Sequence, residues 1–277
     1  MTTRGEPRLA HGVTVAGTEV RFGIRGDGPR DLVLLHGSGA NHMWWHAVAP
    51  QLERSWRVIS VDFSGHGDSG HRATYDAQTW ADELLAVIGA AGAAAPVVGA
   101  HSLGGRVALV AAAGAPSAFA GLVLFDTGIW APEGLRERLA GLAARTGPPR
   151  VYPTREDALA RFVLMPPQPA AAAELLGPVA EYSLRPVEGG WSWKHAGQAF
   201  PHLYEDVVAQ AAADVTVPVA YVSGEASSVV TEELAQRAAE TFAGPVMVRL
   251  PGAHHHLPLE VPQECARLID ELGGGMR

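Results

Sequence analysis

Residues 96–105 read PVVGAHSLGG, and this stretch decides the fold. The apolar run Pro96–Gly99 predicts a buried strand, and Leu103–Ala113 predicts a helix that begins directly after it. A strand that passes at once into a helix needs a sharp turn, with a strained residue at its apex and small residues on both sides. Ser102 is at the apex, between the small residues Ala100 and Gly104. We predict that the Ser102 hydroxyl lies at the carboxyl edge of a sheet as a nucleophile; a serine that only caps the helix is the alternative.

The same alternation of strand and helix extends in both directions from this turn. Strands are predicted over Val13–Val15, Val20–Ile24, Leu32–Leu35, Val58–Val61, Pro96–Gly99, Leu122–Phe125, Val217–Val222 and Val246–Leu250. Helices are predicted over Trp44–Glu53, Ala77–Ala91, Leu103–Ala113, Thr231–Phe242 and Gln263–Leu272. This pattern predicts an α/β fold with a mostly parallel, eight-stranded sheet, helices on both faces and an initial hairpin.

The alternation stops over residues 129–213, which are rich in proline and contain no convincing core strand. Short helical patterns lie between the prolines, at Glu156–Leu164 and Ala170–Leu176. Because the strand pattern resumes afterwards, we expect a helical cap inserted into one domain made of residues 1–128 and 214–277. A proline-rich linker between two separate domains is the alternative.

Composition excludes several classes of protein. The 277 residues carry a net charge of −8 and no cluster of lysine or arginine, so neither a nucleic acid nor a membrane is expected as a partner. A single cysteine, Cys265, allows no intrachain disulfide. The first residues lack the apolar segment of a signal peptide, and the simplest location is the cytoplasm. We expect a monomer or a homodimer that uses no cofactor.

A serine nucleophile needs a base, and an oxyanion needs hydrogen-bond donors. His254, His255 and His256 follow the last predicted strand and would return over the edge of the sheet near Ser102. His36 and His66 follow earlier strands and remain alternatives. The backbone N–H groups of Leu103 and Ser38 are the expected oxyanion donors, because glycines on both sides of Ser38 let that loop approach closely.

Three consecutive histidines also raise the question of a metal ion. We expect no metal site, because adjacent residues do not face one point and the chain lacks the usual spacing of zinc ligands.

Four motifs, in this order, resemble those of the α/β-hydrolase fold family. LLHGSG resembles the oxyanion loop, VDFSGHGDS the segment after the next strand, GAHSLGG the nucleophile elbow, and PGAHHHLPLEVP the histidine loop. The resemblance covers nearly the whole chain and implies that His255 is the catalytic histidine. It also implies that residues 129–213 are the cap that such enzymes carry after the sixth strand.

The chain departs from this family at the catalytic acid. The loop after the seventh strand usually reads Gly-x-x-Asp, but here Gly224 is followed by Ser227. A serine carries no charge, and loss of the acid costs about 10⁴ in turnover. Asp126, at the end of the sixth strand, is our preferred acid, and Glu225 is the alternative. On this basis Asp126→Asn should cripple the enzyme, whereas Ser227→Ala should be nearly silent.

A serine at the elbow implies acyl transfer through an acyl-enzyme, on an ester, lactone or related acyl bond. The expected substrate is a mid-sized hydrophobic small molecule, because apolar and aromatic residues are plentiful in the cap and near the oxyanion loop. We expect substrate contacts from Trp44, Trp130, Phe162, Trp191 and Trp193. Met165, Tyr182, Phe200, Tyr204 and Trp45 are further candidates. A non-hydrolytic role, as a small-molecule receptor or a cofactor-free biosynthetic catalyst, remains an alternative, as does hydrolysis of a carbon–carbon bond.

Overall fold

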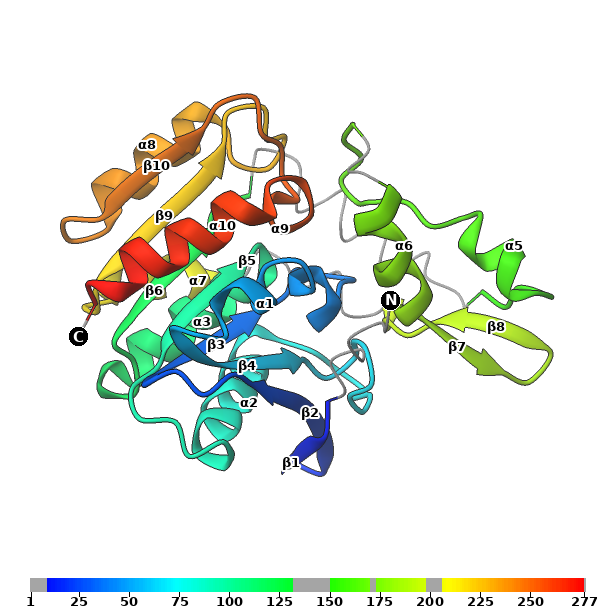
Figure 1. The fold of residues 1–277 in the computed structure, drawn as a ribbon. Coiled ribbons are helices and arrows are strands. Elements are labelled where there is room, and N and C mark those ends of the chain that lie inside the picture. Colours follow the sequence, from blue (N-terminus) through cyan, green and yellow to red (C-terminus); the bar gives the residue numbers. More distant parts are fainter. Residues whose placement is uncertain (1–8, 132–149, 170–172, 198–205, 277) are drawn as a thin grey trace.

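A computed structural model describes residues 9–131, 150–169, 173–197 and 206–276. Within them, the main sheet has eight strands in the order β1-β2-β4-β3-β5-β6-β9-β10 (Figure 1). The strands are β1 (His11–Val15), β2 (Thr18–Arg25), β3 (Arg30–Leu35), β4 (Trp56–Asp62), β5 (Val97–His101), β6 (Gly121–Phe125), β9 (Val219–Gly224) and β10 (Val246–Leu250). The pairings β1–β2 and β2–β4 are antiparallel and the others are parallel. The eight predicted strands and the initial hairpin are therefore confirmed.

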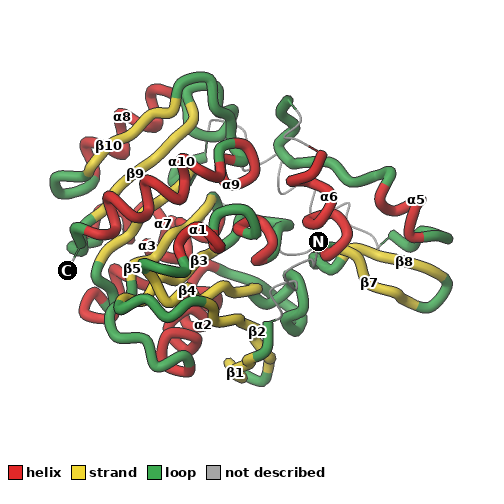
Figure 2. Tube along the Cα trace, viewed as in Figure 1, coloured by secondary structure: helices red, strands yellow, loops and turns green. Residues whose placement is uncertain are grey.

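Helices cover both faces of this sheet (Figure 2). The helices α2 (Ala77–Ala90), α3 (Leu103–Gly114), α7 (Asp206–Asp214) and α8 (Glu232–Thr241) contribute to one apolar core. A second core contains residues of α1 (Ala49–Leu52), α9 (Leu257–Glu260), α10 (Pro262–Leu268) and the π-helical turn η4 (Ile269–Gly273). Strand β3 contributes to both cores, because Val33 and Leu35 belong to the first core, and Leu32 and Leu34 belong to the second. Side chains alternate across a strand, so a strand covered on both faces is apolar throughout.

One predicted helix is divided in the structure. Instead of a continuous helix over Trp44–Glu53, a 3-10 turn η1 (His42–Trp45) precedes the single-turn α1. The Asn41 side chain accepts a hydrogen bond from the N–H of Met43 and so starts η1. Pro50 lies in the first turn of α1, the position where a helix tolerates proline.

The segment between β6 and β9 leaves the sheet beyond its carboxyl edge (Figure 1). It contains α5 (Arg155–Leu159), α6 (Ala173–Tyr182) and a separate two-stranded sheet of β7 (Leu184–Val187) and β8 (Gly190–Trp193). The sequence predicts only helices in this segment, so the hairpin of β7 and β8 differs from the prediction. It forms because Gly189 and Gly190 adopt positive φ angles of 80° and 147°, which favour glycine. Helix α7 ends this segment and packs against α3.

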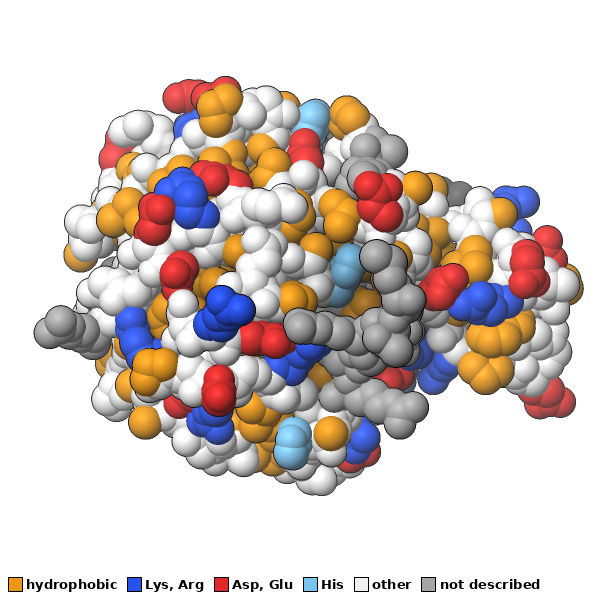
Figure 3. All heavy atoms as spheres, in the orientation of Figure 1, with side chains coloured by type: hydrophobic (Ala, Val, Ile, Leu, Met, Phe, Trp, Pro, Cys, Tyr) orange, Lys and Arg blue, Asp and Glu red, His pale blue; other side chains and the backbone are white. Residues whose placement is uncertain are grey.

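The visible surface mixes acidic and basic side chains, without a large patch of either sign (Figure 3). In the described part of the chain, no helix combines the length and the apolar character that crossing a bilayer requires.

Candidate active site

Ser102 occupies a strained turn between β5 and α3. Its backbone has φ 52° and ψ −113°, a conformation that residues other than glycine rarely adopt. Small neighbours make the turn possible: a Cβ on Gly104 would lie 2.7 Å from the Leu35 Cβ, and one on Gly105 would lie 2.0 Å from Thr127 Oγ1. The turn predicted from PVVGAHSLGG is therefore present, with Ser102 at its apex and 9% exposed.

Asp126 lies beside Ser102 because β5 and β6 are neighbours in register. His101 pairs with Phe125, and the Ser102 N–H donates to the Phe125 carbonyl at 3.0 Å. Asp126 therefore follows β6 at the same edge of the sheet, fully buried and with a φ of 45°.

The Asp126 carboxylate receives three hydrogen bonds. His255 Nδ1 donates to Oδ1 at 2.8 Å, Ser227 Oγ donates to Oδ1 at 2.6 Å, and the Gly224 N–H donates to Oδ2 at 2.9 Å. Ser227, at the position where the family usually has the acid, therefore contacts Asp126, our preferred acid. Glu225, the alternative acid, is exposed, and the described hydrogen bonds do not join it to His255.

His255 reaches this edge from the loop between β10 and α9, and its ring is buried. Because Nδ1 donates to Asp126, Nε2 carries the lone pair that a base needs. Among the described residues, no hydrogen bond joins Ser102 to His255. Catalytic hydrogen bonds are often long in free enzymes and shorten only when substrate binds.

The predicted oxyanion loop, residues 36–39, lies against the Ser102 turn. A Cβ on Gly37 would be 3.2 Å from the Ser102 Cβ, and the Gly104 N–H donates to the His36 carbonyl at 3.1 Å. The N–H groups of Ser38 and Leu103 donate no hydrogen bond within the described part of the chain. Both amides are therefore without an acceptor among the described residues, which is consistent with the predicted role as oxyanion donors.

The alternative bases His36 and His66 support this loop instead. His36 Nε2 accepts from the Phe63 N–H at 3.2 Å, and its Nδ1 donates to the Gly37 carbonyl at 2.7 Å. His66 Nε2 accepts from the Gly39 N–H at 3.1 Å. Burial lowers the pKa of His36 to about 4 and that of His66 well below its usual value, so both rings stay neutral.

Asp62 is a buried anchor whose role the sequence did not reveal. Its carboxylate accepts from the backbone N–H of His42 at 2.7 Å, from the His42 ring at 3.0 Å and from the Asp68 N–H at 2.9 Å. Tyr182, from α6, donates to it at 3.0 Å. Burial alone would raise the pKa of Asp62, but His42, through its ring and its backbone N–H, holds this pKa far below the usual value. Asp62 therefore ties the inserted segment to the core.

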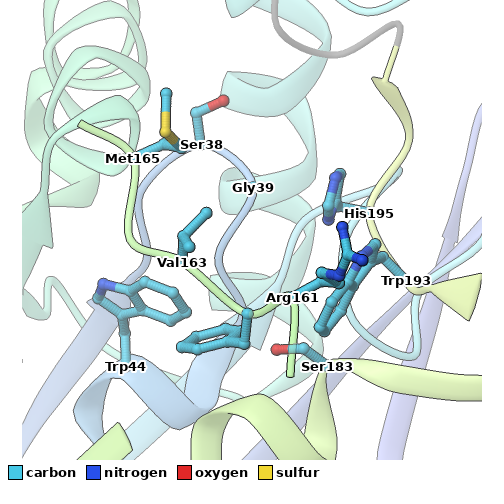
Figure 4. A pocket seen from close by; sticks show the side chains of 10 residues that line it. Ser38, Gly39, Trp44, Arg161, Val163, Met165, Ser183, Trp193 and His195 are labelled. Atoms are coloured by element: carbon cyan, nitrogen blue, oxygen red, sulfur yellow. The ribbon is translucent and has the colours of Figure 1, made fainter. Parts of the chain in front are cut away.

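A pocket of about 240 Å³ lies between the oxyanion loop and the inserted segment (Figure 4). Its lining residues are Ser38, Gly39, Trp44, Arg161, Phe162, Val163, Met165, Ser183, Trp193 and His195. Trp44, Phe162 and Trp193, three of the five expected substrate contacts, are among them. Arg161 is not among the expected contacts, because only aromatic and apolar residues suggested themselves in the sequence. It is the charged side chain of this lining, and Figure 4 shows it directed toward Trp193 and His195.

Trp130 and Trp191, the other two expected contacts, do not line this pocket. The Arg237 guanidinium lies 4.3 Å from the centre of the Trp130 ring. Trp191 packs with Tyr152 and Leu184 in a small core of the inserted segment. Both serve packing in the described structure. Of the further candidates, Phe200 and Tyr204 lie outside the described residues.

Two of the three consecutive histidines, His255 and His256, come together with His101. One ring nitrogen from each of His101, His255 and His256 lies within 4.8 Å of the other two. The premise that adjacent histidines cannot face one point is therefore wrong for His255 and His256.

The sheet order, the strained turn after β5 and the histidine loop after β10 together define an α/β-hydrolase-fold protein. The model of the alpha/beta hydrolase family matches residues 32–268, and the chain belongs to this family.

Relatives of known name are consistent with this membership. The chain is 29% identical over 250 residues to 2-(acetamidomethylene)succinate hydrolase of Mesorhizobium japonicum, and these 250 residues are 88% of each chain. It is 41% identical over 98 residues to pimeloyl-[acyl-carrier protein] methyl ester esterase of Edwardsiella ictaluri, over 35% of this chain and 36% of that one. A crystal structure of E-2-(acetamidomethylene)succinate hydrolase matches with a TM-score of 0.82 and 25% identity, over 96% of this chain and 98% of the other. The hydrolase and esterase names support an enzyme of the alpha/beta hydrolase superfamily.

Proposed function

We propose that this protein is a serine hydrolase that cleaves an ester, lactone or related acyl bond of a mid-sized hydrophobic small molecule. The observation that carries the proposal is the 2.8 Å hydrogen bond between Asp126 and His255, at the sheet edge where Ser102 occupies a strained turn. A carboxylate, an imidazole and a hydroxyl in this chain order are what nucleophilic acyl transfer needs.

In the proposed mechanism, His255 Nε2 takes the proton of Ser102 as its Oγ attacks the acyl carbon. Asp126 holds the Nδ1–H of His255 and stabilises the imidazolium that forms. The N–H groups of Ser38 and Leu103 would stabilise the oxyanion, each contributing a factor of about 10²–10³. His255 then gives its proton to the leaving group, which departs and leaves an acyl group on Ser102. A water molecule activated by the same histidine releases the acid.

The described pocket suggests the character of the substrate. Trp44, Phe162, Val163, Met165 and Trp193 make most of the lining apolar, which suits an acyl chain or a ring. Arg161 adds a positive charge, and no ion pair of this side chain occurs among the described residues. We therefore expect a substrate with an apolar body and a carboxylate or another acceptor group on the side near Arg161. The residues between β6 and β9 act in this proposal as the cap over Ser102.

Labelling with a fluorophosphonate, which reacts with activated serines, tests the proposal. We expect one adduct, located on Ser102 by mass spectrometry, that is absent in Ser102→Ala and forms orders of magnitude more slowly in His255→Ala. A panel of p-nitrophenyl esters and lactones then identifies the preferred acyl group. Absence of both labelling and turnover in the folded protein would refute the proposed function.

A further inference from the structure

Three buried imidazoles meet beside the Ser102 turn. His101 ends β5, and His255 and His256 come from the loop before α9. The ring centres of His101 and His255 are 4.8 Å apart, and those of His255 and His256 are 4.9 Å apart. All three side chains are nearly inaccessible to solvent, with exposures of 1% for His101, 4% for His255 and 3% for His256. The proposed mechanism uses only one of them.

Each ring is held by an acceptor that cannot donate. His101 Nε2 donates to the His255 carbonyl at 2.9 Å, and His256 Nε2 donates to the Pro166 carbonyl at 3.1 Å. His255 Nδ1 donates to the Asp126 carboxylate at 2.8 Å. A neutral imidazole has a single N–H, so the opposite nitrogen of each ring carries a free lone pair. These nitrogens are Nδ1 of His101, Nε2 of His255 and Nδ1 of His256.

Two of the three free lone pairs are buried acceptors. Nδ1 of His101 and Nδ1 of His256 have no hydrogen-bond partner among the described residues, although both atoms are inaccessible to solvent. Leaving such a group unpaired costs about 1–3 kcal/mol, so native proteins seldom do so without a reason.

This arrangement matches the environment of histidines that bind metal ions. A ligating histidine usually donates its other N–H to a backbone carbonyl or a carboxylate, which fixes the ring and its tautomer. Gly37 keeps the space beside His101 open, since a Cβ at that position would lie 2.9 Å from Nδ1. Three neutral imidazoles are a common ligand set for Zn²⁺ and related ions, with the fourth position left for water or substrate.

We propose that His101, His255 and His256 bind a divalent transition-metal ion such as Zn²⁺, and that the bound ion inhibits the enzyme by occupying Nε2 of His255. The distances allow it with a small adjustment. At a Zn–N distance of about 2.0–2.1 Å, tetrahedral ligand nitrogens lie about 3.4 Å apart. One nitrogen of each ring lies within 4.8 Å of one nitrogen of each of the other two, and rotation of the rings would bring the free lone pairs to the spacing that the ion needs.

The inhibitory part of this inference rests on the proposed role of His255 as the base, but the binding part does not. Binding is therefore measured separately from activity. The probes are Zn²⁺ alone, by isothermal titration calorimetry of metal-free protein, and Co²⁺ alone, by its visible absorption, which is intense in tetrahedral sites. Both are applied to the wild type and to the inactive Ser102→Ala.

His256→Ala removes one ligand, and His254→Gln is the matched control. His254 is adjacent in sequence, but its Nδ1 contacts Glu260 at 2.9 Å, and the Gln amide can replace that hydrogen bond. We expect one Zn²⁺ per chain in the wild type, in Ser102→Ala and in His254→Gln. We expect roughly tenfold or greater weakening in His256→Ala. Zn²⁺ should inhibit ester hydrolysis by the wild type and by His254→Gln, with recovery on adding EDTA, and His256→Ala should need at least tenfold more Zn²⁺.

Several outcomes overturn the metal site: no binding heat and no Co²⁺ absorption at millimolar metal, or binding that survives in His256→Ala and is lost in His254→Gln. A second outcome is that the wild type binds the metal, His256→Ala binds it more weakly, and the protein has no esterase activity. This outcome would support the metal site and contradict the proposed function. Zn²⁺-insensitive esterase activity that depends on Ser102 would instead support the function and reject the inhibitory site.

Discussion

Replacing Asp126 by asparagine is the most direct test of the acid. The substitution preserves shape but places an amide among three donors: His255 Nδ1, Ser227 Oγ and the Gly224 N–H. If the amide oxygen faces Gly224, its NH₂ faces His255 and forces the ring to accept at Nδ1. The proton then moves to Nε2, and no lone pair remains to take the Ser102 proton. If the oxygen faces His255, the NH₂ opposes the Gly224 N–H.

The expected loss follows from this geometry. Loss of the acid and of the correct tautomer lowers turnover by about 10⁴, or roughly 5 kcal/mol of transition-state stabilisation. The loss should fall mainly on kcat, because Asp126 is not among the residues that line the described pocket. The assay is steady-state hydrolysis of the best ester from the panel, together with the rate of fluorophosphonate labelling. Circular dichroism and the melting temperature check that the variant folds.

Glu225→Gln is the matched control, because it changes the other candidate acid in the same way. Glu225 is exposed, so we expect wild-type kinetics within about twofold, as for most surface changes. A folded Asp126→Asn within tenfold of the wild type, beside a crippled Glu225→Gln, would show that the acid has been placed wrongly.

Four further predictions follow from other contacts. The sequence suggested that Ser227→Ala would be nearly silent, but the structure changes this expectation, because the substitution removes the 2.6 Å hydrogen bond to Asp126 and the acceptor for the N–H groups of Val229 and Val230. We expect kcat to fall about three- to tenfold and the free energy of unfolding to fall by about 1 kcal/mol, measured by kinetics and urea denaturation; unchanged values would contradict this role. For pH, burial lowers the pKa of His36 to about 4 against 6.5 in the unfolded chain, so the unfolded state binds more protons between these values and stability falls as the pH is lowered. His36 alone should contribute a loss of about 2 kcal/mol between about pH 7.5 and about pH 5, and a flat urea-unfolding profile would refute it. Arg161→Gln should raise KM about three- to tenfold for carboxylate-bearing esters but not for neutral esters, and added salt should diminish this difference. Equal changes in KM for both kinds of ester would reject the contact between Arg161 and an anionic substrate. Gly37→Ala places a Cβ 2.9 Å from His101 Nδ1 and 3.2 Å from the Ser102 Cβ. We therefore expect kcat to fall at least tenfold with little change in melting temperature. A variant with the kcat of the wild type would argue against a tightly packed oxyanion loop.

Strands buried on both faces are the elements that the sequence predicts best. Leu32–Leu35 is apolar at every position because its alternate side chains enter two different cores. The turn at Ser102 is equally readable, since only small residues fit beside it. The inserted segment is harder. Its hairpin depends on two glycines with positive φ, and the prolines around it concealed the pattern, because Pro186 lies within β7 itself.

The predicted helix over Trp44–Glu53 failed for a related reason. Its apolar spacing is real, since Met43, Trp44, Trp45 and Leu52 are all buried, but apolar spacing does not show whether one helix or two short turns carries it. Pro50 marked the break, because proline favours the first turn of a helix and so pointed to a new start there.

Side-chain directions set the limit of what sequence could reveal about the site. The resemblance to the fold family was enough to favour Asp126, because some members of that family place the acid at the end of the sixth strand; the structure puts this strand end beside that of β5. The tautomers of His101 and His256 could not be inferred, because they depend on which carbonyl each ring meets, and the Pro166 carbonyl comes from a distant part of the chain.

The role of Ser227 could be inferred only in part from the sequence. In the sequence it marks a missing acid, but the structure gives it a hydrogen bond to Asp126, the acid that we propose in its place. When the carboxylate moves from the loop after β9 to the end of β6, the loop still approaches the same histidine. A residue left there must therefore either donate to the carboxylate or leave its Oδ1 with one donor fewer. A serine fits this position because its hydroxyl donates to Asp126 while its lone pairs accept the N–H groups of Val229 and Val230, and so it also holds the loop in place.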